Sequence, residues 1–277
     1  ERENDMPNNQ LRDVQLIELE ILKEVARVCE ENNIEYFLDS GTVLGAIRHG
    51  GFIPWDDDVD IAMIRENYDK FLQIAPKCLG SNYYLQSRET DHKYPHVFAK
   101  VRKNDTVFME WNTRKNDMHH GIYIDIFPYD NVPDDKKQRE QYLKKCRFLY
   151  RLFSLRAISE RYHQVLNSPK QIAQVVIRKI LHCALKIIPI VTIENKMNTL
   201  FKKYNTTQTG YLTCHPYSDA YVFKRETLFP VSTIKFENHE FPAPNKIEEY
   251  LTEMYGDYLQ LPPEAERVGH NPYKVHY

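Results

Sequence analysis

The 277-residue chain predicts a mixed α/β (α+β) fold, and three features of the sequence carry this prediction. Short apolar runs of strand length alternate with amphipathic helical patterns as far as residue 130. Two long helical patterns follow, and after Gly210 the sequence returns to strand-and-turn character. We therefore predict a mixed β-sheet core at 1–130, a helical insertion at 131–209, and a C-terminal β-rich segment at 210–277 that completes the core.

The individual elements follow from residue spacing. Apolar residues three and four apart predict core helices at 11–31, 42–48 and 65–78. Strand-like runs occupy 34–38, 59–64, 83–86, 97–102, 106–110 and 121–128. The last of these is the clearest, because β-branched residues alternate around a lone Asp125. Beyond the core we predict helices at 135–166, 169–203 and 247–255.

Composition limits the classes of function. The formal net charge is −2, so nothing predicts a nucleic-acid partner. The five cysteines are scattered, with no C-x-x-C pair, which argues against a disulfide framework or zinc ribbon and for a reducing compartment. The first ten residues are polar, and no uncharged apolar stretch of about 18 residues occurs. We expect a soluble, cytoplasmic protein.

An aspartate-rich segment predicts a metal site. Asp58 and Asp60 lie two residues apart, so on an extended strand both project from the same face. Asp125 could supply a third carboxylate from its own strand. Carboxylate oxygens are the ligands that Mg²⁺ or Mn²⁺ prefers. Upstream, Gly41 and Thr42 open a short helix whose free N–H groups favour a phosphate. This layout suits metal-assisted phosphoryl or nucleotidyl transfer.

Two other interpretations compete with a catalytic metal site. Acidic runs commonly form solvated turns, but here apolar residues flank the run on both sides, and burying carboxylates there is costly without a compensating cation. A calcium loop of the EF-hand type starting at Asp56 would require Gly at its sixth position and Glu at its twelfth. Ile61 and Asn67 occupy those positions, so this alternative fails.

The motifs resemble a known family. Residues 39–61 read DSGTVLGAIRHGGFIPWDDDVDI, which closely resembles the signature of the LicD family of phosphocholine transferases. The family belongs to the nucleotidyltransferase-fold superfamily and includes the fukutin-like glycan-modifying proteins. The resemblance continues at 98–102, at 124–128 and in the C-terminal positions 255–270, so it spans nearly the whole chain outside the helical insertion. It implies a nucleotidyltransferase-like core.

The resemblance also implies site roles. Gly41 and Thr42 would bind phosphate, Asp58 and Asp60 would bind the metal, and Asp125 would be a metal ligand or the base that accepts the acceptor proton. Basic candidates for the donor phosphates are Arg48, His49, Lys100, Arg102, Arg267 and His270. For the first four residues, the alternative role is a surface salt bridge. Arg267 and His270 lie in a C-terminal tail that either folds over the site or is merely exposed. Asp56 and Asp57 would either orient Arg48 or a metal-bound water, or shape the turn.

The implied reaction transfers phosphocholine from CDP-choline to a sugar hydroxyl and releases CMP. A cell-surface glycan precursor, of teichoic acid or lipopolysaccharide type and free or lipid-linked, would be the acceptor. Choline requires an aromatic cage, which the sequence does not assign. Alternatives with the same fold move phosphoethanolamine, a polyol phosphate or a nucleotidyl group. A glycosyltransferase D-x-D motif and a degenerate nucleotide-binding scaffold are further alternatives, and the long motif and the intact carboxylates argue against them.

The helical insertion is strongly basic. Between Lys136 and Lys186 there are thirteen Lys and Arg against two Glu, a local net charge of +11. Over 170–190 a polar stripe accompanies a broad apolar face. Such a helix could lie on the inner face of an anionic cytoplasmic membrane. The alternative is a helix pair packed on the core with its basic face in solvent.

Overall fold

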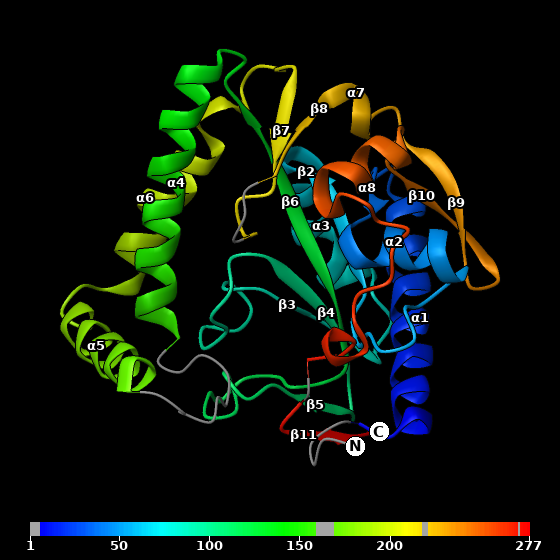
Figure 1. Ribbon diagram of the computed structural model, residues 1–277, viewed down its shortest axis with the longest axis horizontal. Coiled ribbons are helices and arrows are strands. Elements are labelled where there is room, and N and C mark those ends of the chain that lie inside the picture. The colour runs from blue at the N-terminus through cyan, green and yellow to red at the C-terminus, as the bar shows by residue number, and fades with distance from the viewer. Residues whose placement is uncertain (1–5, 159–168, 218–220, 271) are drawn as a thin grey trace.

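The computed structural model describes residues 6–158, 169–217, 221–270 and 272–277, and Figure 1 shows their arrangement. A seven-stranded sheet forms the centre of the molecule. Its main path runs in the order β1 (Phe37–Leu38), β2 (Asp60–Ile64), β6 (Tyr123–Val132), β4 (Ala99–Lys103) and β3 (Tyr83–Gln86). The β2–β6 pair is parallel and the other pairs are antiparallel. The predicted mixed α+β fold is confirmed.

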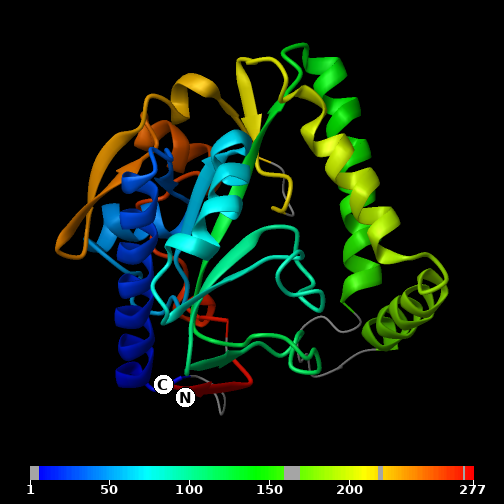
Figure 2. The ribbon, with the colours of Figure 1, turned by 180° about the vertical axis from the view of Figure 1, so that it is seen from behind.

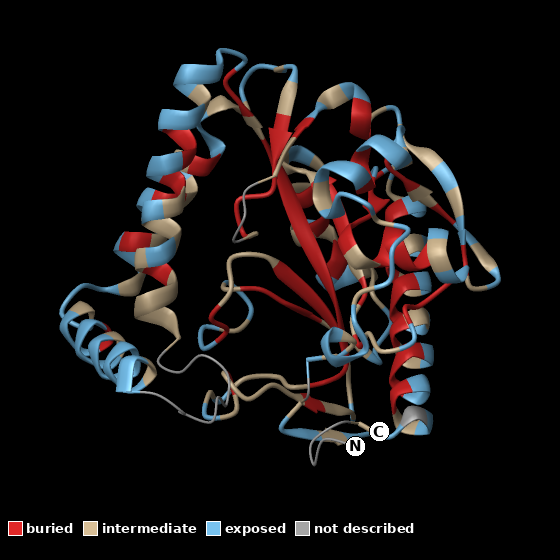
Figure 3. Ribbon diagram, viewed as in Figure 1, coloured by how far each residue is buried: buried red, intermediate tan, exposed pale blue. Residues whose placement is uncertain are grey.

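Helices cover this sheet and hold the motif segments at its edge. α1 (Asn8–Glu31) and α3 (Arg65–Cys78) contact β6 and each other, so they lie on one face of the sheet (Figure 2). α2 (Ser40–His49) lies against β2 and α8 (Ile247–Tyr255). It also contacts β9 (Ser232–Phe236), which forms a hairpin with β10 (His239–Ala243). The sheet interior is almost entirely buried (Figure 3).

The C-terminal part of the chain returns to the core at two places. β7 (Tyr211–Thr213) pairs with the distal end of β6, and β8 (Val222–Lys224) pairs with β7. A short helix α7 (Arg225–Leu228) follows. The last strand β11 (Lys274–His276) pairs with β5 (Val107–Met109), close to the N-terminal end of α1 (Figure 1). The β-rich C-terminal segment was predicted; its pairing partners were not.

The insertion forms a separate helical layer beside the sheet. α4 (Lys136–Ala157) packs against α6 (Ile190–Phe201), and α5 (Pro169–Leu185) contacts α4. Short 3-10 helices occur at Lys202–Tyr204 and Glu264–Glu266. A second apolar cluster joins α4 and α6 to the end of β6 and contains Val132, Tyr142, Leu143, Cys146, Phe153, Ile193, Met197 and Phe201. The predicted border at residue 130 falls inside β6, and the domain boundaries stay a prediction.

The predicted helix 169–203 is wrong as a single element. The structure breaks it into α5 and α6, because Pro189 lacks an N–H and caps the start of α6. The predicted helix 135–166 ends at Ala157 in the described residues, and its remaining part 159–166 lies outside them. Among the described helices, none combines the length and the hydropathy that crossing a bilayer requires.

Candidate active site

Strand register brings Asp60, Asp125 and Lys100 into one row across the sheet. Asp60 lies opposite Asp125 in the parallel pair β2–β6, and Asp125 lies opposite Lys100 in the antiparallel pair β6–β4. Residues that face each other in neighbouring strands project from the same face of the sheet. Lys100 is 2% exposed; its Nζ lies 2.9 Å from Asp125 Oδ1 and 3.2 Å from the centroid of the Tyr123 ring. The row therefore contains two carboxylates and one buried cation.

The aspartate loop, residues 55–59, leads into β2 and is fastened from two sides. Gln15 of α1 donates from Nε2 to the carbonyl of Asp56 at 2.9 Å. The N–H of Asp125 donates to the carbonyl of Val59 at 2.8 Å. Asp58 lies two residues before Asp60, the first residue of β2, and its side chain is 20% exposed. The loop conformation depends on the core, unlike that of a free solvated turn.

The N-terminal turn of α2 lies directly against the aspartate loop. Thr42 Oγ1 accepts a hydrogen bond of 2.8 Å from the N–H of Asp60, which joins the predicted phosphate turn to the predicted metal strand. A Cβ on Gly41 would lie 3.1 Å from Asp56 Oδ2, so glycine permits this close approach. The predicted phosphate and metal residues are therefore neighbours.

A buried cluster of tyrosines, which no sequence pattern predicts, holds this turn. Asp39 accepts hydrogen bonds from Tyr217 at 2.8 Å, from Tyr129 at 3.1 Å, and from the hydroxyl of Tyr250. Burial raises the pKa of Asp39, and the three hydroxyl donors oppose that shift. Asp39 therefore ties the start of α2 to β6 and to α8. Its tyrosine partners are remote in sequence, so no local pattern reveals them.

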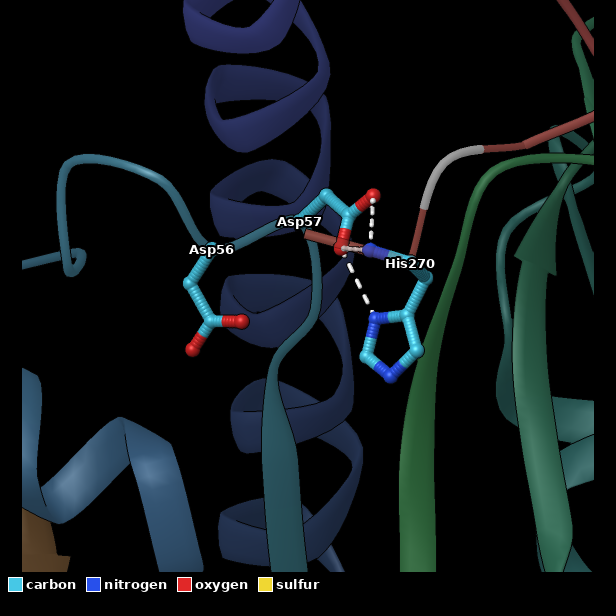
Figure 4. A group of neighbouring side chains, drawn as sticks. All are labelled: Asp56, Asp57 and His270. Carbon is cyan, nitrogen blue, oxygen red and sulfur yellow. Dashed lines mark hydrogen bonds and ion pairs between the residues drawn. The ribbon is translucent and has the colours of Figure 1, made fainter. Parts of the chain in front are cut away.

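The C-terminal segment folds back onto the aspartate loop (Figure 4). Asp57, 1% exposed, accepts hydrogen bonds from the backbone N–H of His270 at 2.9 Å and from its Nδ1 at 2.8 Å. The negative charge of Asp58 and the bond to Asp57 raise the pKa of His270 well above its ordinary value. The guanidinium of Arg267 lies 5.3 Å from the centroid of the Trp55 ring. Of the two predicted states of this segment, the structure shows the folded-back one.

The remaining basic candidates differ in their access to the site. Arg48 donates from Nη1 to the carbonyl of Tyr258 at 3.4 Å, so it points toward the C-terminal segment. His49 is exposed, with its ring centroid 6.0 Å from that of Trp55. Arg102 is fully buried, and its Nη1 donates to the carbonyl of Gly121 at 2.6 Å. Arg102 thus offers no exposed guanidinium to a phosphate in this structure.

Burial and mutual repulsion raise the pKa values of Asp56, Asp60 and Asp125. Burial and the charge of Asp58 raise the pKa of Asp60 well above its ordinary value. The same two causes act on Asp56. Burial raises the pKa of Asp125 to about 6, although the neighbouring Lys100 opposes the shift. Carboxylates packed this closely favour a bound cation or a proton among them.

Glu18 on α1 is a further acidic neighbour that sequence reasoning missed. It is 1% exposed, and its Oε2 has no hydrogen-bond partner among the described residues. Burial and then the charge of Asp58 raise its pKa well above the ordinary value. A signal was present: Glu18 occupies a position at helical spacing between the buried Leu11 and Leu22, where an apolar residue is expected.

The donor set fits a divalent cation. Asp58, Asp60 and Asp125 provide oxygen ligands of the kind that Mg²⁺ or Mn²⁺ prefers, and the Oε2 of Glu18 is a buried oxygen without a partner among the described residues that a cation could satisfy. In the described part of the chain, the group of three ligand atoms that all lie within 4.8 Å of one another belongs to Asp56, Asp57 and His270, and this structure does not bring Asp58, Asp60 and Asp125 that close together. We interpret that group as the fastening of the C-terminal segment, because the Asp57–His270 hydrogen bonds already satisfy it.

Comparisons with known proteins show which sequences this chain is similar to. A sequence model described as the LicD/FKTN/FKRP nucleotidyltransferase domain matches residues 33–157. The lipopolysaccharide cholinephosphotransferase LicD of Haemophilus influenzae is 30% identical over 266 residues, which cover 94% of this chain and 96% of that protein. An uncharacterized protein of Rickettsia prowazekii is 43% identical over 42% of this chain and 40% of its own length. The human ribitol 5-phosphate transferase FKRP is 40% identical over 67 residues, 23% of this chain and 14% of that protein.

Proposed function

Because the chain belongs to the LicD/FKTN/FKRP family, we propose that it is a metal-dependent phosphocholine transferase. It moves phosphocholine from CDP-choline to a sugar hydroxyl of a cell-surface glycan precursor, of teichoic acid or lipopolysaccharide type, and releases CMP. The observation that carries the proposal is the row of Asp60 and Asp125 across β2 and β6, with Asp58 at its mouth, in a chain that matches LicD over nearly its full length.

The choice of donor rests on the extent of similarity. The relative that transfers phosphocholine by name aligns with 94% of this chain, whereas the ribitol 5-phosphate transferase aligns with 23%. We therefore propose CDP-choline first. The second candidate is another CDP-linked phospho-alcohol, such as ribitol, ethanolamine or glycerol phosphate, or a nucleotidyl group, and the FKRP similarity specifically favours ribitol phosphate within that group.

The acidic residues would divide the chemistry among them. Asp58, Asp60 and Asp125 would hold Mg²⁺ or Mn²⁺, which when bound supplies charge stabilisation for the phosphate oxygens. The acceptor oxygen forms the new bond to the phosphorus that carries choline, the bond from that phosphorus to CMP breaks, and CMP leaves with the electron pair. The hydroxyl proton passes to a carboxylate; as the alternative to binding the metal, Asp125 would be that base, because it lies in the same row as Asp60.

The basic residues would position the donor. The backbone N–H of Gly41 lies at the start of α2, where a phosphate binds favourably, whereas the N–H of Thr42 already donates to the carbonyl of Asp39 at 3.1 Å. Lys100 lies beside Asp125 and would neutralise a phosphate oxygen. Further out, the donor would meet Arg48, His49, Arg267 and His270, of which His270 is held by Asp57 at the loop. The phosphate contact predicted for Arg102 stays a prediction.

A donor comparison tests the proposal. The purified protein is incubated with Mg²⁺, an amino-sugar acceptor in free or lipid-linked form, and CDP-choline, CDP-ethanolamine or CDP-ribitol, and CMP release is measured. We expect CMP from CDP-choline, and a loss on the order of 10³-fold in Asp60→Asn, because metal binding contributes several kcal/mol to such reactions. Asp105→Asn is the matched control, since Asp105 is exposed in a turn at φ 60° that asparagine also adopts.

The other outcomes are equally informative. CMP release from CDP-ribitol or CDP-ethanolamine alone would transfer the assignment to the second candidate. Equal CMP release by Asp60→Asn and the unaltered protein would contradict the proposed role of the carboxylate row.

A further inference from the structure

The helix α5 is turned with its polar stripe toward the protein. His182, the one residue of α5 that is buried among those described, donates a hydrogen bond of 2.9 Å from Nδ1 to the carbonyl of Leu155 at the end of α4. Arg178 donates from Nη2 to the carbonyl of Ile158 at 2.8 Å. These contacts use the polar side of the helix. The opposite, apolar side therefore faces outward, the reverse of an ordinary surface helix.

The outward side presents a continuous apolar surface. Ile177 is 56% exposed, Ile180 is 62% exposed, and Ile187 beyond the end of the helix is 87% exposed. This surface, which we call the α5 apolar face, consists of Ile172, Ala173, Val176, Ile177, Ile180, Cys183, Ala184 and Ile187. Figure 3 shows α5 as an almost wholly exposed helix at the far end of the insertion. Proteins seldom leave such a patch in water unless something covers it.

Charge identifies what would cover it. On a helical projection Lys170 and Lys179 border opposite edges of the α5 apolar face, and Lys186 follows the last turn. No Asp or Glu occurs between residues 161 and 193. A second copy of the chain would bring like charges together across such a face, which is unfavourable. A surface with anionic headgroups over hydrocarbon complements both the lysines at the edges and the apolar centre.

We propose that the α5 apolar face binds the surface of a membrane that contains anionic lipid. The helix lies in the interface with its apolar residues among the acyl chains and its lysines at the headgroups. Its polar side stays bonded to the end of α4, so α5 holds the insertion to the membrane. The inference does not depend on the proposed reaction, because lipid binding is measured without substrate.

Co-sedimentation tests the surface directly. The full chain is mixed with vesicles of phosphatidylcholine, or of phosphatidylcholine with an equal amount of phosphatidylglycerol, and the bound fraction is measured. We expect binding to the anionic vesicles, weakened by salt. Ile180→Glu should weaken it by about tenfold or more, the loss of one buried isoleucine. Lys179→Gln should weaken it about fivefold, the value of one lysine near an anionic surface. The matched control is Leu259→Glu, because Leu259 is 64% exposed on another part of the molecule.

A fluorescent probe locates the contact. Among the five cysteines, all in the described part of the chain, Cys183 alone is exposed, and it lies on the α5 apolar face. A nitrobenzoxadiazole label at Cys183, in a Cys78→Ser background, should shift its emission to the blue with anionic vesicles. No sedimentation, equal sedimentation of Ile180→Glu and Leu259→Glu, or an unshifted label would overturn the proposal. A dimer in light scattering that Ile180→Glu dissociates, without vesicle binding, would overturn it in favour of a self-association face.

Discussion

At the scale of single residues, the three consecutive aspartates have different surroundings. Asp58 is partly exposed at the mouth of the site, whereas Asp57 is buried and bonded to His270. The carbonyl of Asp56 accepts a hydrogen bond from Gln15, and its carboxylate lies beside Gly41. The sequence predicted supporting roles for the first two aspartates of the run, and the structure indicates what Asp57 supports, namely the C-terminal segment.

We expect the contributions of Lys100 and Asp125 to the free energy of unfolding to be strongly coupled. Lys100→Met, measured without divalent metal, should lower the free energy of unfolding by about 3 kcal/mol, because it leaves a buried carboxylate without its cation. The double variant Lys100→Met with Asp125→Asn removes both charges and should recover part of this loss. Urea denaturation of the two single variants and the double variant measures the coupling. Additive losses would contradict a direct interaction.

His215 provides a pH prediction that is separate from the site. Burial lowers its pKa to about 4, and its ring lies stacked on Phe201 with the centroids 4.1 Å apart. His215 binds a proton near pH 6.5 in the unfolded chain but only near pH 4 in the folded chain. The stability contributed by neutral His215 is therefore lost as the pH falls through this window. At pH 5 we expect a loss of about 2 kcal/mol.

The comparison of variants isolates this effect. Urea denaturation from pH 7 to pH 5 should show a steeper decline for the unaltered protein than for His215→Gln. His276→Gln, at an exposed position, is the control and should keep the steep decline. Identical slopes in the unaltered protein and in His215→Gln would contradict the assignment.

The site residues that could be predicted from the sequence are those that belong to a local pattern. The spacing of Asp58 and Asp60 and the lone Asp125 could be recognised along the chain, because strand geometry fixes how such residues project. Glu18 broke a helical apolar pattern and could have been noticed. The partners of Asp39 could not, because Tyr129, Tyr217 and Tyr250 reach it from three distant segments.

At the scale of elements, the site is an assembly of a sheet edge, a helix start and a returning C-terminal segment. Asp57→Ala should release that segment from the aspartate loop, because His270 loses the acceptor for both its N–H and its Nδ1. Amide hydrogen exchange at residues 259–270 should accelerate by about tenfold or more, the value of a charge-assisted hydrogen bond. Asp117→Ala, at an exposed position, should leave exchange unchanged. Equal protection in both variants would show that other contacts hold the segment.

Element prediction succeeded where the local pattern was strong. Helix α3 and helix α8 have the predicted bounds 65–78 and 247–255, because their apolar spacing is regular. The strand predicted at 121–128 continues to Val132, since β7 supplies hydrogen-bonding partners that the local sequence cannot reveal. The amphipathic pattern of α5 was recognised, but pattern alone does not determine which side faces the protein. That choice depends on the carbonyls at the end of α4.

At the scale of the whole molecule, charge is separated between two regions. The insertion from Lys136 to Lys186 carries +11 in a chain of net charge −2, so the remainder is strongly acidic. The site carboxylates contribute to that excess, and burial together with repulsion by Asp58 raises the pKa values of Asp56 and Asp60. A divalent cation that binds the folded chain should therefore raise the stability of the entire molecule.

Thermal denaturation measures this linkage. Mg²⁺ or Mn²⁺ should raise the melting temperature of the unaltered protein, by an amount equivalent to about 2.7 kcal/mol at a hundred times its dissociation constant, and EDTA should reverse the change. Asp58→Asn with Asp60→Asn should abolish the metal effect. Because it also removes repelling charges, this variant should melt at a higher temperature than the unaltered protein in EDTA. An undiminished metal effect in the double variant would place the cation elsewhere.

The contact between Asp57 and His270 joins residues 213 positions apart. During synthesis, the sheet and all the carboxylates emerge from the ribosome long before residue 270 does. A nascent chain can therefore fold its acidic row while the segment that fastens the loop is still being translated. A polypeptide that terminates before residue 270 would retain every proposed metal ligand and lack the fastening.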